Sequence, residues 1–499
     1  MIDLDVTQKD SVYLRIDCEA GIARELSDFF SFKVPGHQFM PSYRSRLWDG
    51  TIKLFSLQTQ ELYAGLVDYV EKFANERKYT LAMPSKTTTE MDTAKVSSFA
   101  EEYLNVHSGG KKITLHAHQA VAICHAIKNE RCLLLSPTAS GKSLIIYSLI
   151  RYYLDKIPKN KKLLVIVPTV SLVEQMVSDF DDYSSANGWD APSKCHKILA
   201  GAEKTTSKRV VVSTWQSLFK QPEKYFEQFG AVFGDECHLY KAKSLTSIMT
   251  KLKDCPYRIG TTGTLDGTDV YKLVIEGLFG RVFEVTKTKD LMEKKILSAL
   301  KIDCIVMDYP KVLRESVKKA KYADEIKYII SLQERNEFIV NLCKNIKGNT
   351  LVLFQFVEGH GQILNTLMRS SIPSDRKIFF VYGGTEAKER EEIRKIVETE
   401  TNAVIIASVG VFSTGVSIKR LHNIIFASPS KSRIRVLQSI GRQLRVSESK
   451  EVAKLYDIGD DLSWKSWVNH TYRHLKERIK IYESEGFEHR IVKIKIGVH

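Results

Sequence analysis

The sequence predicts an α/β protein with two tandem doubly wound parallel-sheet lobes, a small N-terminal α+β domain and a short helical C-terminal extension. Short apolar runs recur along the chain, and helix-like stretches separate them. One set lies at residues 132–136, 163–168, 209–213, 231–235 and 257–262, and a second set lies at 350–355, 377–382, 403–408, 423–428 and 454–459. Because strands that alternate with helices form right-handed βαβ units and parallel sheets, two sets of runs predict two lobes.

The same pattern sets the expected domain boundaries. We expect an N-terminal domain over residues 1–108, a first lobe over 109–285, a connector over 286–325, a second lobe over 326–460 and a helical extension over 461–499. Within the extension, residues 462–485 carry apolar side chains at the spacing of a long amphipathic helix. In the N-terminal domain, Asp49-Gly50 predicts the tight turn of a β-hairpin over residues 47–52.

Composition and charge describe a globular chain with a basic balance. Of its 499 residues, 43% are apolar and 27% are charged, and 74 Lys and Arg against 59 Asp and Glu leave a net charge of +15. A chain of this length needs several hydrophobic cores. A basic balance favours a polyanionic partner, because neutralised phosphates release bound counterions. A charge that only serves solubility is the alternative.

Cysteine usage and hydropathy bear on location. The eight cysteines are scattered and form no CxxC pair, which argues against a zinc or redox site. The N-terminus lacks the apolar stretch of a signal peptide, and polar residues and glycines interrupt the one long uncharged run, 401–418. We therefore expect no membrane association and a reducing, cytoplasmic location.

A phosphate-binding loop is the first candidate site. It follows the apolar run 132–135 and opens a helix-like stretch, and its residues are Ser136, Pro137, Thr138, Ala139, Ser140, Gly141, Lys142 and Ser143. In such a loop, backbone N–H groups and a helix N-terminus face the anion. Lys142 would reach the β- and γ-phosphates of ATP, and the Ser143 hydroxyl would coordinate Mg²⁺. Ser136 stands where the usual pattern has its first Gly, and a chance Gly-Lys-Ser is the alternative.

An acidic pair at the end of the apolar run 231–234 is the second candidate. Asp235 would hold the same Mg²⁺, and Glu236 would polarise the attacking water. A solvated turn is the alternative reading of two adjacent acids. Cys237 and His238 follow directly, but no further Cys or His stands at ligand spacing, so we do not expect a transition-metal site.

Over residues 110–450 the sequence resembles the helicases of superfamily 2, because their motifs occur here in the same order. The matching segments are Gln119, Pro168-Thr169 with Leu172 and Gln175, Ser213–Gln216, Thr262–Thr264, Phe354–Phe356, Ser408–Ser417 and the QxxGRxxR motif Gln438–Arg445. This resemblance implies two RecA-like lobes, ATP hydrolysis and a nucleic-acid substrate.

The resemblance also implies a role for single residues. Arg442 and Arg445 would stabilise charge on the γ-phosphate. Further nucleotide contacts would come from Gln119, Gly415 and Gln438, and nucleic-acid contacts from Pro168, Thr169, Gln175, Thr214, Gln355 and Ser408. Ser417 stands where the family often has an acid, which leaves a ribose contact at that position open.

The substrate depends on features that vary among these helicases. The acidic motif reads Asp-Glu-Cys-His and the last motif begins with Gln438, and both favour translocating members over strand-local RNA unwinders. In the N-terminal domain, Arg44 and Arg46 would contact phosphates and Trp48 would stack on an unpaired base. A hairpin that only serves as scaffold is the alternative.

Along its whole length the chain resembles the recombination-repair helicases of T-even bacteriophages. This implies unwinding and branch migration of forks, Holliday junctions, D-loops and RNA–DNA R-loops in recombination, replication and repair, in the cytoplasm of a bacterial host. A superfamily 2 double-stranded DNA translocase or RNA helicase without branch migration is the alternative. An inactive nucleic-acid-binding protein and a phosphate-loop kinase fit less well, since Lys142, Glu236 and the QxxGRxxR motif are all present.

Overall fold

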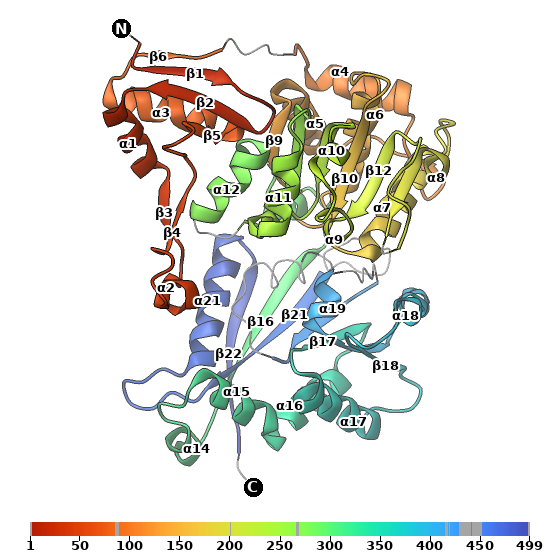
Figure 1. Cartoon of the computed structure of the whole chain (residues 1–499). Coiled ribbons are helices and arrows are strands. Elements are labelled where there is room, and N and C mark those ends of the chain that lie inside the picture. The colour runs from red at the N-terminus through yellow and green to blue at the C-terminus, as the bar shows by residue number, and fades with distance from the viewer. Residues whose placement is uncertain are drawn as a thin grey trace. The chain divides into compact units, whose positions relative to one another are not determined.

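The computed structural model describes residues 2–84, 89–199, 201–265, 269–414, 418, 420–428, 441 and 452–497. The chain forms two compact units (Figure 1), one made of residues 1–136 and 140–286 and the other of residues 137–139 and 287–499. In the described part of the chain, no helix has both the length and the apolar character that crossing a bilayer requires.

A small α+β fold occupies the N-terminal part of the first unit. Its elements are β1 (Leu4–Gln8), β2 (Tyr13–Cys18), α1 (Ala20–Phe29), β5 (Glu61–Tyr63), η2 (Ala64–Leu66), α3 (Val67–Arg77) and β6 (Leu81–Ala82). The sheet has the order β5-β2-β1-β6, with β1 antiparallel to β2 and parallel to β6. Alternate side chains of β1 and β2 share one core with the apolar faces of α1 and α3.

A projection extends from this fold. It consists of two short antiparallel strands and the segment that connects them. Its elements are β3 (Ser31–Lys33), η1 (His37–Phe39), α2 (Pro41–Arg44) and β4 (Thr51–Lys53). Figure 1 shows α2 at the far end of the projection, away from α1 and α3. The connection between the two strands, residues 34–50, therefore forms a small folded tip of the projection.

The tight hairpin expected over residues 47–52 does not form. The Asp49 carboxylate accepts a 2.9 Å hydrogen bond from the Thr51 N–H, and Gly50 adopts a φ of +78°. This local side-chain turn leads the chain into β4, whose partner strand is β3. The Asp-Gly pair thus marks a turn, as expected, but one that does not join adjacent strands.

The first lobe is a parallel sheet with helices on both faces. Its strands are β9 (Arg131–Leu135), β10 (Lys162–Val167), β11 (Cys195–Ile198), β12 (Val210–Thr214), β13 (Phe229–Gly234), β14 (Tyr257–Thr262) and β15 (Val282–Glu284). The order is β11-β12-β10-β13-β14-β9-β15, and each described pairing is parallel.

Two cores lie on the two faces of this sheet. One involves α5 (Ala117–Asn129), α6 (Lys142–Leu154) and α7 (Val170–Ser184), and the other involves α11 (Lys243–Lys251) and α12 (Asp269–Phe279). Alternate residues of β10 belong to opposite cores, with Leu163 on one face and Leu164 on the other. Burial on both faces explains why the strands read as continuous apolar runs.

The second lobe repeats this plan. Its strands are β16 (Ala299–Asp308), β17 (Thr350–Phe354), β18 (Ile378–Val381), β19 (Val404–Ser408), β20 (Asn423–Phe426), β21 (Val452–Asp461) and β22 (Glu488–Lys495). The order is β18-β19-β17-β20-β21-β16-β22, again with each described pairing parallel. The predicted pair of doubly wound lobes is confirmed.

Two strands of this sheet lie where the sequence analysis expected none. β16 falls inside the expected connector 286–325, and β22 falls inside the expected helical extension 461–499. Charged residues such as Lys301 and Asp303 interrupt β16, and β22 is a largely exposed edge strand, so neither reads as an apolar run. The extension also contains the expected amphipathic helix, α21 (His470–Ser484).

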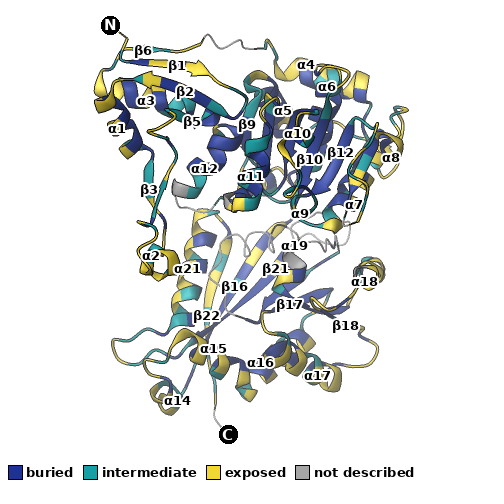
Figure 2. Cartoon of the chain, viewed as in Figure 1, coloured by how far each residue is buried: buried dark blue, intermediate teal, exposed yellow. Residues whose placement is uncertain are grey.

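Buried ion pairs attach two helices to β21 in the second lobe. Arg335, on α16 (Gln333–Asn345), donates to Asp460 at 2.7 Å, and Arg478 on α21 donates to Asp457 at 2.8 Å. Figure 2 shows most of β21 as buried. Since a lone buried charge is costly, each pair ties its helix to one position on the sheet.

Candidate active site

The predicted phosphate loop joins β9 to α6 in the first lobe. Gly141 has a φ of +85°, and a Cβ added there would lie 2.1 Å from Nε2 of Gln119. Lys142 is the first residue of α6, and its Nζ donates to the Ser136 carbonyl at 3.2 Å. The loop therefore stands at the N-terminus of a long helix with its lysine folded back over it, which is the arrangement that receives a phosphate group.

Side chains of α5 support this loop through hydrogen bonds to its backbone. The Ser140 carbonyl accepts hydrogen bonds from Nε2 of His118 at 2.9 Å and from Nε2 of Gln119 at 3.1 Å. The Ser136 and Ser140 hydroxyls are 2.6 Å apart. Both ends of the Gln119 amide are engaged, because its Oε1 accepts from the His116 N–H at 2.9 Å. Gln119 thus shapes the loop, a task that the sequence analysis missed along with His118.

The Ser143 hydroxyl lies 2.9 Å from the hydroxyl of Tyr183 on α7. Tyr183 was not predicted as part of this site, since it stands forty residues away in an amphipathic helix and no motif contains it. Its hydroxyl orients Ser143 in the first turn of α6.

The acidic pair follows β13, a neighbour of β10 and β14 in the sheet. Asp235 is buried, and its Oδ1 accepts a 2.8 Å hydrogen bond from the Thr261 hydroxyl. Burial raises the pKa of Asp235 and the charge of Glu236 raises it further, whereas the charge of Lys142 lowers it. Two adjacent carboxylates in a buried place favour a bound cation, and oxygen ligands are those that Mg²⁺ prefers. The residues present fit the expected metal.

Glu236 has a strained backbone and a buried neighbour. Its φ of +50° is unusual for a residue with a side chain. The Nδ1 atom of His238 lies 3.3 Å from Oε2 of Glu236 and 3.1 Å from Oγ1 of Thr262. Because the Thr262 hydroxyl donates to the Thr264 carbonyl at 2.9 Å, it accepts from His238, whose Nδ1 therefore carries the proton.

His238 consequently connects the acidic pair to the Thr262–Thr264 motif. The sequence analysis considered this histidine only as a metal ligand and discounted it. Among the described residues no group of three or more His, Cys, Asp or Glu side chains is placed to hold a metal ion, and Cys237 is buried with its Sγ 3.2 Å from the Gly234 carbonyl. The position of His238 directly after the acidic pair was the only sequence signal for this role. Its hydrogen-bond partner, Thr262, lies 24 residues further along the chain, so the sequence did not indicate the contact.

The expected nucleic-acid contacts of the first lobe lie along one edge of its sheet. Pro168 and Thr169 follow β10, and Thr214 ends β12, which pairs with β10 in register at Val167 and Thr214. Thr169 caps α7, and its hydroxyl accepts from the Leu172 N–H at 3.4 Å. Gln175 lies one turn further along α7 and is partly exposed. This carboxyl edge also carries Asp235, as expected for a ligand site of a parallel sheet.

The corresponding residues of the second lobe lie at the carboxyl edge of the second sheet. Gln355 follows β17 and is exposed, and Ser408 ends the neighbouring strand β19. The Gln355 N–H donates to the Ser428 hydroxyl at 3.1 Å. The predicted sites Gly415, Gln438, Arg442 and Arg445 lie outside the described residues.

The three predicted contacts of the N-terminal domain lie on the projection. Arg44 and Arg46 are exposed, and Nε of Arg44 approaches the Gln38 carbonyl at 3.4 Å. Trp48 is half-buried, and its indole N–H donates to the Thr51 carbonyl at 2.8 Å. The arginines therefore face solvent, whereas the indole helps to hold the projection together.

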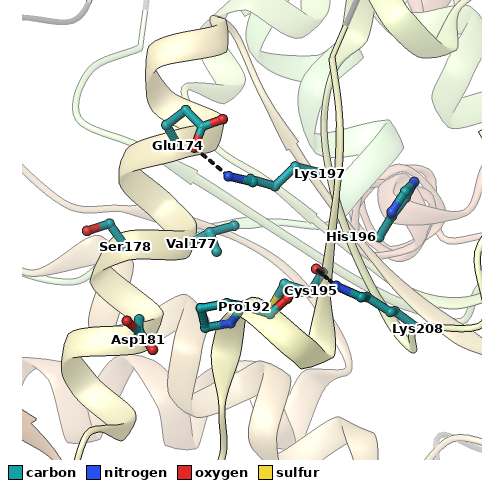
Figure 3. Close-up of a pocket in the computed structure, with 9 residues that line it drawn as sticks. All are labelled: Glu174, Val177, Ser178, Asp181, Pro192, Cys195, His196, Lys197 and Lys208. Atoms are coloured by element: carbon teal, nitrogen blue, oxygen red, sulfur yellow. Dashed lines mark hydrogen bonds and ion pairs between the residues drawn. The ribbon is translucent and has the colours of Figure 1, made fainter. Parts of the chain in front are cut away.

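A separate pocket of about 450 Å³ lies between α7 and the amino ends of β11 and β12 (Figure 3). Lys197 donates to Glu174 at 2.6 Å, and Lys208 donates to the Pro192 carbonyl at 2.7 Å. Both lysines are thus engaged by groups of the protein itself, and the phosphate loop and the acidic pair belong to the opposite edge of the sheet.

Comparison with known families places this site in a class. Matches are found to the N-terminal domain of the DNA helicase UvsW over residues 3–84, to the res subunit of type III restriction enzymes over 112–267 and to the helicase conserved C-terminal domain over 334–447. The fold and the site are therefore those of an ATP-hydrolysing nucleic-acid helicase of superfamily 2.

A relative identifies the family. The chain is 35% identical to the ATP-dependent DNA helicase uvsW of Enterobacteria phage T4, over 98% of this chain and 99% of that protein. The chain belongs to the UvsW family of DNA helicases. It is also 23% identical to the DNA 3'-5' translocase XPB2 of Sulfurisphaera tokodaii, over 68% of this chain and 80% of that protein.

Solved structures agree with this assignment. The crystal structure of T4 UvsW matches 99% of this chain and 100% of its own with 32% identity and a TM-score of 0.53. The type ISP restriction-modification enzyme LlaBIII bound to DNA matches 88% of this chain and 36% of its own with a TM-score of 0.56. At 14% identity, that second likeness shows the fold alone.

Proposed function

We propose that this helicase uses ATP and Mg²⁺ to unwind and branch-migrate branched DNA, including forks, Holliday junctions and D-loops, and to unwind RNA–DNA R-loops. These reactions serve recombination, replication and repair. The observation that carries the proposal is a basic projection on an N-terminal domain that belongs to the same compact unit as the ATP-binding lobe. Such a domain can hold DNA in one place relative to the phosphate loop.

The ATP-site residues take the roles that their positions support. Lys142 binds the β- and γ-phosphates, and Ser143 and Asp235 hold Mg²⁺, which neutralises phosphate charge when it is bound. Glu236 orients and polarises the attacking water, and His238 keeps the Glu236 carboxylate beside the Thr262–Thr264 motif. Gln119 contacts the adenine in addition to supporting the loop.

The proposed nucleic-acid contacts lie in two places, the two lobes that form the motor and the N-terminal domain. Residues at the carboxyl edges of the sheets contact the backbone of the strand being moved, namely Pro168, Thr169, Gln175, Thr214, Gln355 and Ser408. Arg44 and Arg46 on the projection contact phosphates near the branch point.

One unwinding panel tests this function. Forked, four-way, D-loop and R-loop substrates of matched sequence are compared with a linear duplex, and Lys142→Ala reports the ATP dependence. We expect ATP-dependent strand exchange on branched substrates and little activity on blunt linear duplex. Lys128→Ala, which removes an exposed lysine of α5, is the matched control and should behave as wild type.

Two outcomes contradict the proposal. Triplex displacement on unbranched duplex without junction activity indicates a double-stranded DNA translocase, and preference for RNA duplex indicates an RNA helicase. Substantial ATP hydrolysis by Lys142→Ala removes the loop from the mechanism.

A further inference from the structure

The tip of the projection presents two large apolar side chains to solvent. Leu47 is 84% exposed and Phe39 is 69% exposed. No other large apolar side chain in the described part of the chain is more exposed than Leu47. Apolar side chains that are exposed together on one element mark a candidate contact surface, whereas single exposed ones are ordinary.

The tip holds these side chains outward through its own internal contacts. The His37 ring packs edge-on against Tyr43 with ring centroids 4.7 Å apart, and its Nδ1 lies 2.8 Å from the Val34 carbonyl. Gly50 packs so closely on the same ring that an added Cβ would lie 2.5 Å from it. The exposure of Phe39 and Leu47 is therefore built into a compact turn.

Further hydrogen bonds fix the base of the tip. The Trp48 indole donates to the Thr51 carbonyl at 2.8 Å, and Lys33 Nζ donates to the Asp49 carbonyl at 2.8 Å. These bonds connect the chain that leaves the tip to β3 and β4. The indole of Trp48 thus lies against β4, whereas the side chain of Leu47 beside it faces solvent.

The charge around the two apolar groups indicates the chemistry of their partner. Arg44 and Arg46 lie between Phe39 and Leu47 in sequence, and residues 29–48 contain neither Asp nor Glu. Cations contact phosphates, and apolar or aromatic side chains contact bases that have lost a stacking neighbour. A predominantly basic tip that exposes apolar side chains is therefore complementary to nucleic acid that has unpaired or unstacked bases.

We propose that Phe39 and Leu47 contact bases at the branch point of DNA, where they pack against bases that are unpaired or partly unstacked, while Arg44 and Arg46 hold the adjoining phosphates. This inference rests on the proposed function and adds the element that recognises the branch. Trp48, which the sequence predicts to stack on an unpaired base, also supports the tip through its indole N–H.

Binding to a four-way junction and to a linear duplex of the same sequence tests the inference. Phe39→Ala and Leu47→Ala should each weaken junction binding about 5- to 150-fold, the equivalent of ~1–3 kcal/mol. Their affinity for linear duplex should fall much less, and the salt dependence of junction binding should keep its slope. Phe39→Tyr, which retains the ring, should bind as wild type.

A fluorescent base reports the contact directly. With 2-aminopurine placed at the branch point, wild type should raise the fluorescence on binding, because the base loses its stacking neighbour. The double variant Phe39→Ala with Leu47→Ala should not, even at saturating protein. Leu57→Ala removes a side chain of the same domain outside the projection that is 49% exposed, and it should match wild type in both measurements.

The outcomes separate this inference from the proposed function. If wild type itself shows no preference for the junction, the proposed function fails. If wild type prefers the junction and the folded double variant keeps that preference and the fluorescence change, the base contact is wrong. A double variant that keeps junction affinity but loses self-association in sedimentation shows that the tip contacts protein, which also overturns the inference.

Discussion

The Tyr69 hydroxyl donates a 2.8 Å hydrogen bond to Oε2 of Glu276, which joins α3 of the N-terminal domain to α12 of the first lobe. Glu276 is only 1% exposed, and its other oxygen accepts from the Val282 N–H at 2.9 Å. The helices also approach closely nearby, because a Cβ added at Gly65 would lie 2.0 Å from the Glu276 carbonyl. The N-terminal domain is consequently packed against the first lobe as part of the same compact unit.

Removing the Tyr69 hydroxyl should weaken this attachment. Tyr69→Phe leaves one oxygen of a buried carboxylate without that donor, so the free energy of unfolding should fall by about 1–3 kcal/mol. Urea denaturation followed by fluorescence measures the change. Tyr79→Phe is the matched control, because it removes a hydroxyl that bonds the exposed Glu25, and it should leave stability nearly unchanged. Equal effects of the two changes would show that the attachment depends on packing alone.

Glu236→Gln should separate nucleotide binding from hydrolysis. The amide keeps the size of the side chain but cannot accept a proton from water, so Mg²⁺-ATP should still bind while turnover becomes very slow. Asp235→Asn should instead weaken Mg²⁺-ATP binding, because it removes a ligand charge. Fluorescent-nucleotide titration and phosphate release measure the two properties. Equal loss of nucleotide affinity in both variants would mean that the roles of the two acids have been confused.

The buried His360 should make stability depend on pH. Its Nδ1 lies 3.0 Å from the Ser428 hydroxyl and its Nε2 lies 3.2 Å from Oδ1 of Asn336. Burial and the charge of Arg335 lower the pKa of His360 to about 3. The unfolded chain binds a proton near pH 6.5, so this contribution to stability is complete above that pH and is lost as pH falls toward 3.

The measurement is urea denaturation at a series of pH values between these limits. His360→Gln should lower stability at neutral pH but should show a flatter decline below pH 6.5 than wild type. Ser428→Ala removes a hydrogen-bond partner but keeps the titrating ring, so its decline should remain as steep as that of wild type. Identical slopes for wild type and His360→Gln would contradict the buried, neutral state of this ring.

Arg442 and Arg445 provide a test of the QxxGRxxR motif. Arg445→Ala should lower kcat about 10³- to 10⁵-fold if the guanidinium stabilises charge on the transferred phosphate, with much less effect on nucleotide affinity. Because Arg442 can share this task, the double substitution decides the question. Near wild-type hydrolysis by the double variant would exclude the motif from the chemistry.

The arginines of the projection should determine part of the salt dependence of junction binding. Arg44→Ala with Arg46→Ala should reduce the slope of log affinity against log salt by about 1.8 units, at ~0.9 per lost phosphate contact. Arg24→Ala with Lys72→Ala removes two exposed cations of α1 and α3 and is the matched control. If affinity and slope are unchanged in the folded double variant, the projection is a scaffold without DNA contacts.

Much of the motor could be predicted because its signals are local in the chain. The phosphate loop is one contiguous stretch between a strand and a helix, and Asp235 directly follows an apolar strand. Most strands of the two sheets are buried on both faces, so they appear as apolar runs whatever their partners are. The approximate positions of the phosphate loop and the acidic pair followed from the same runs.

The contacts around these residues could not be predicted, because each joins distant parts of the chain. Tyr183 reaches Ser143, and His238 reaches Thr262, only after helices and strands have packed. β22 alternates exposed and partly exposed residues, which gives no apolar run to detect.

The sequence by itself determined the fold class, the order of the motifs and the place of the predicted phosphate loop between a strand and a helix, since these depend on residue type and near neighbours. Only the tertiary structure decided that Trp48 supports the projection while Phe39 and Leu47 face solvent. The sequence pattern of an aromatic residue in a basic segment is the same whether its ring stacks on a base or packs on the protein's own backbone. The choice depends on whether a hydrogen-bond acceptor such as the Thr51 carbonyl lies within reach, and folding of the intervening turn sets that distance.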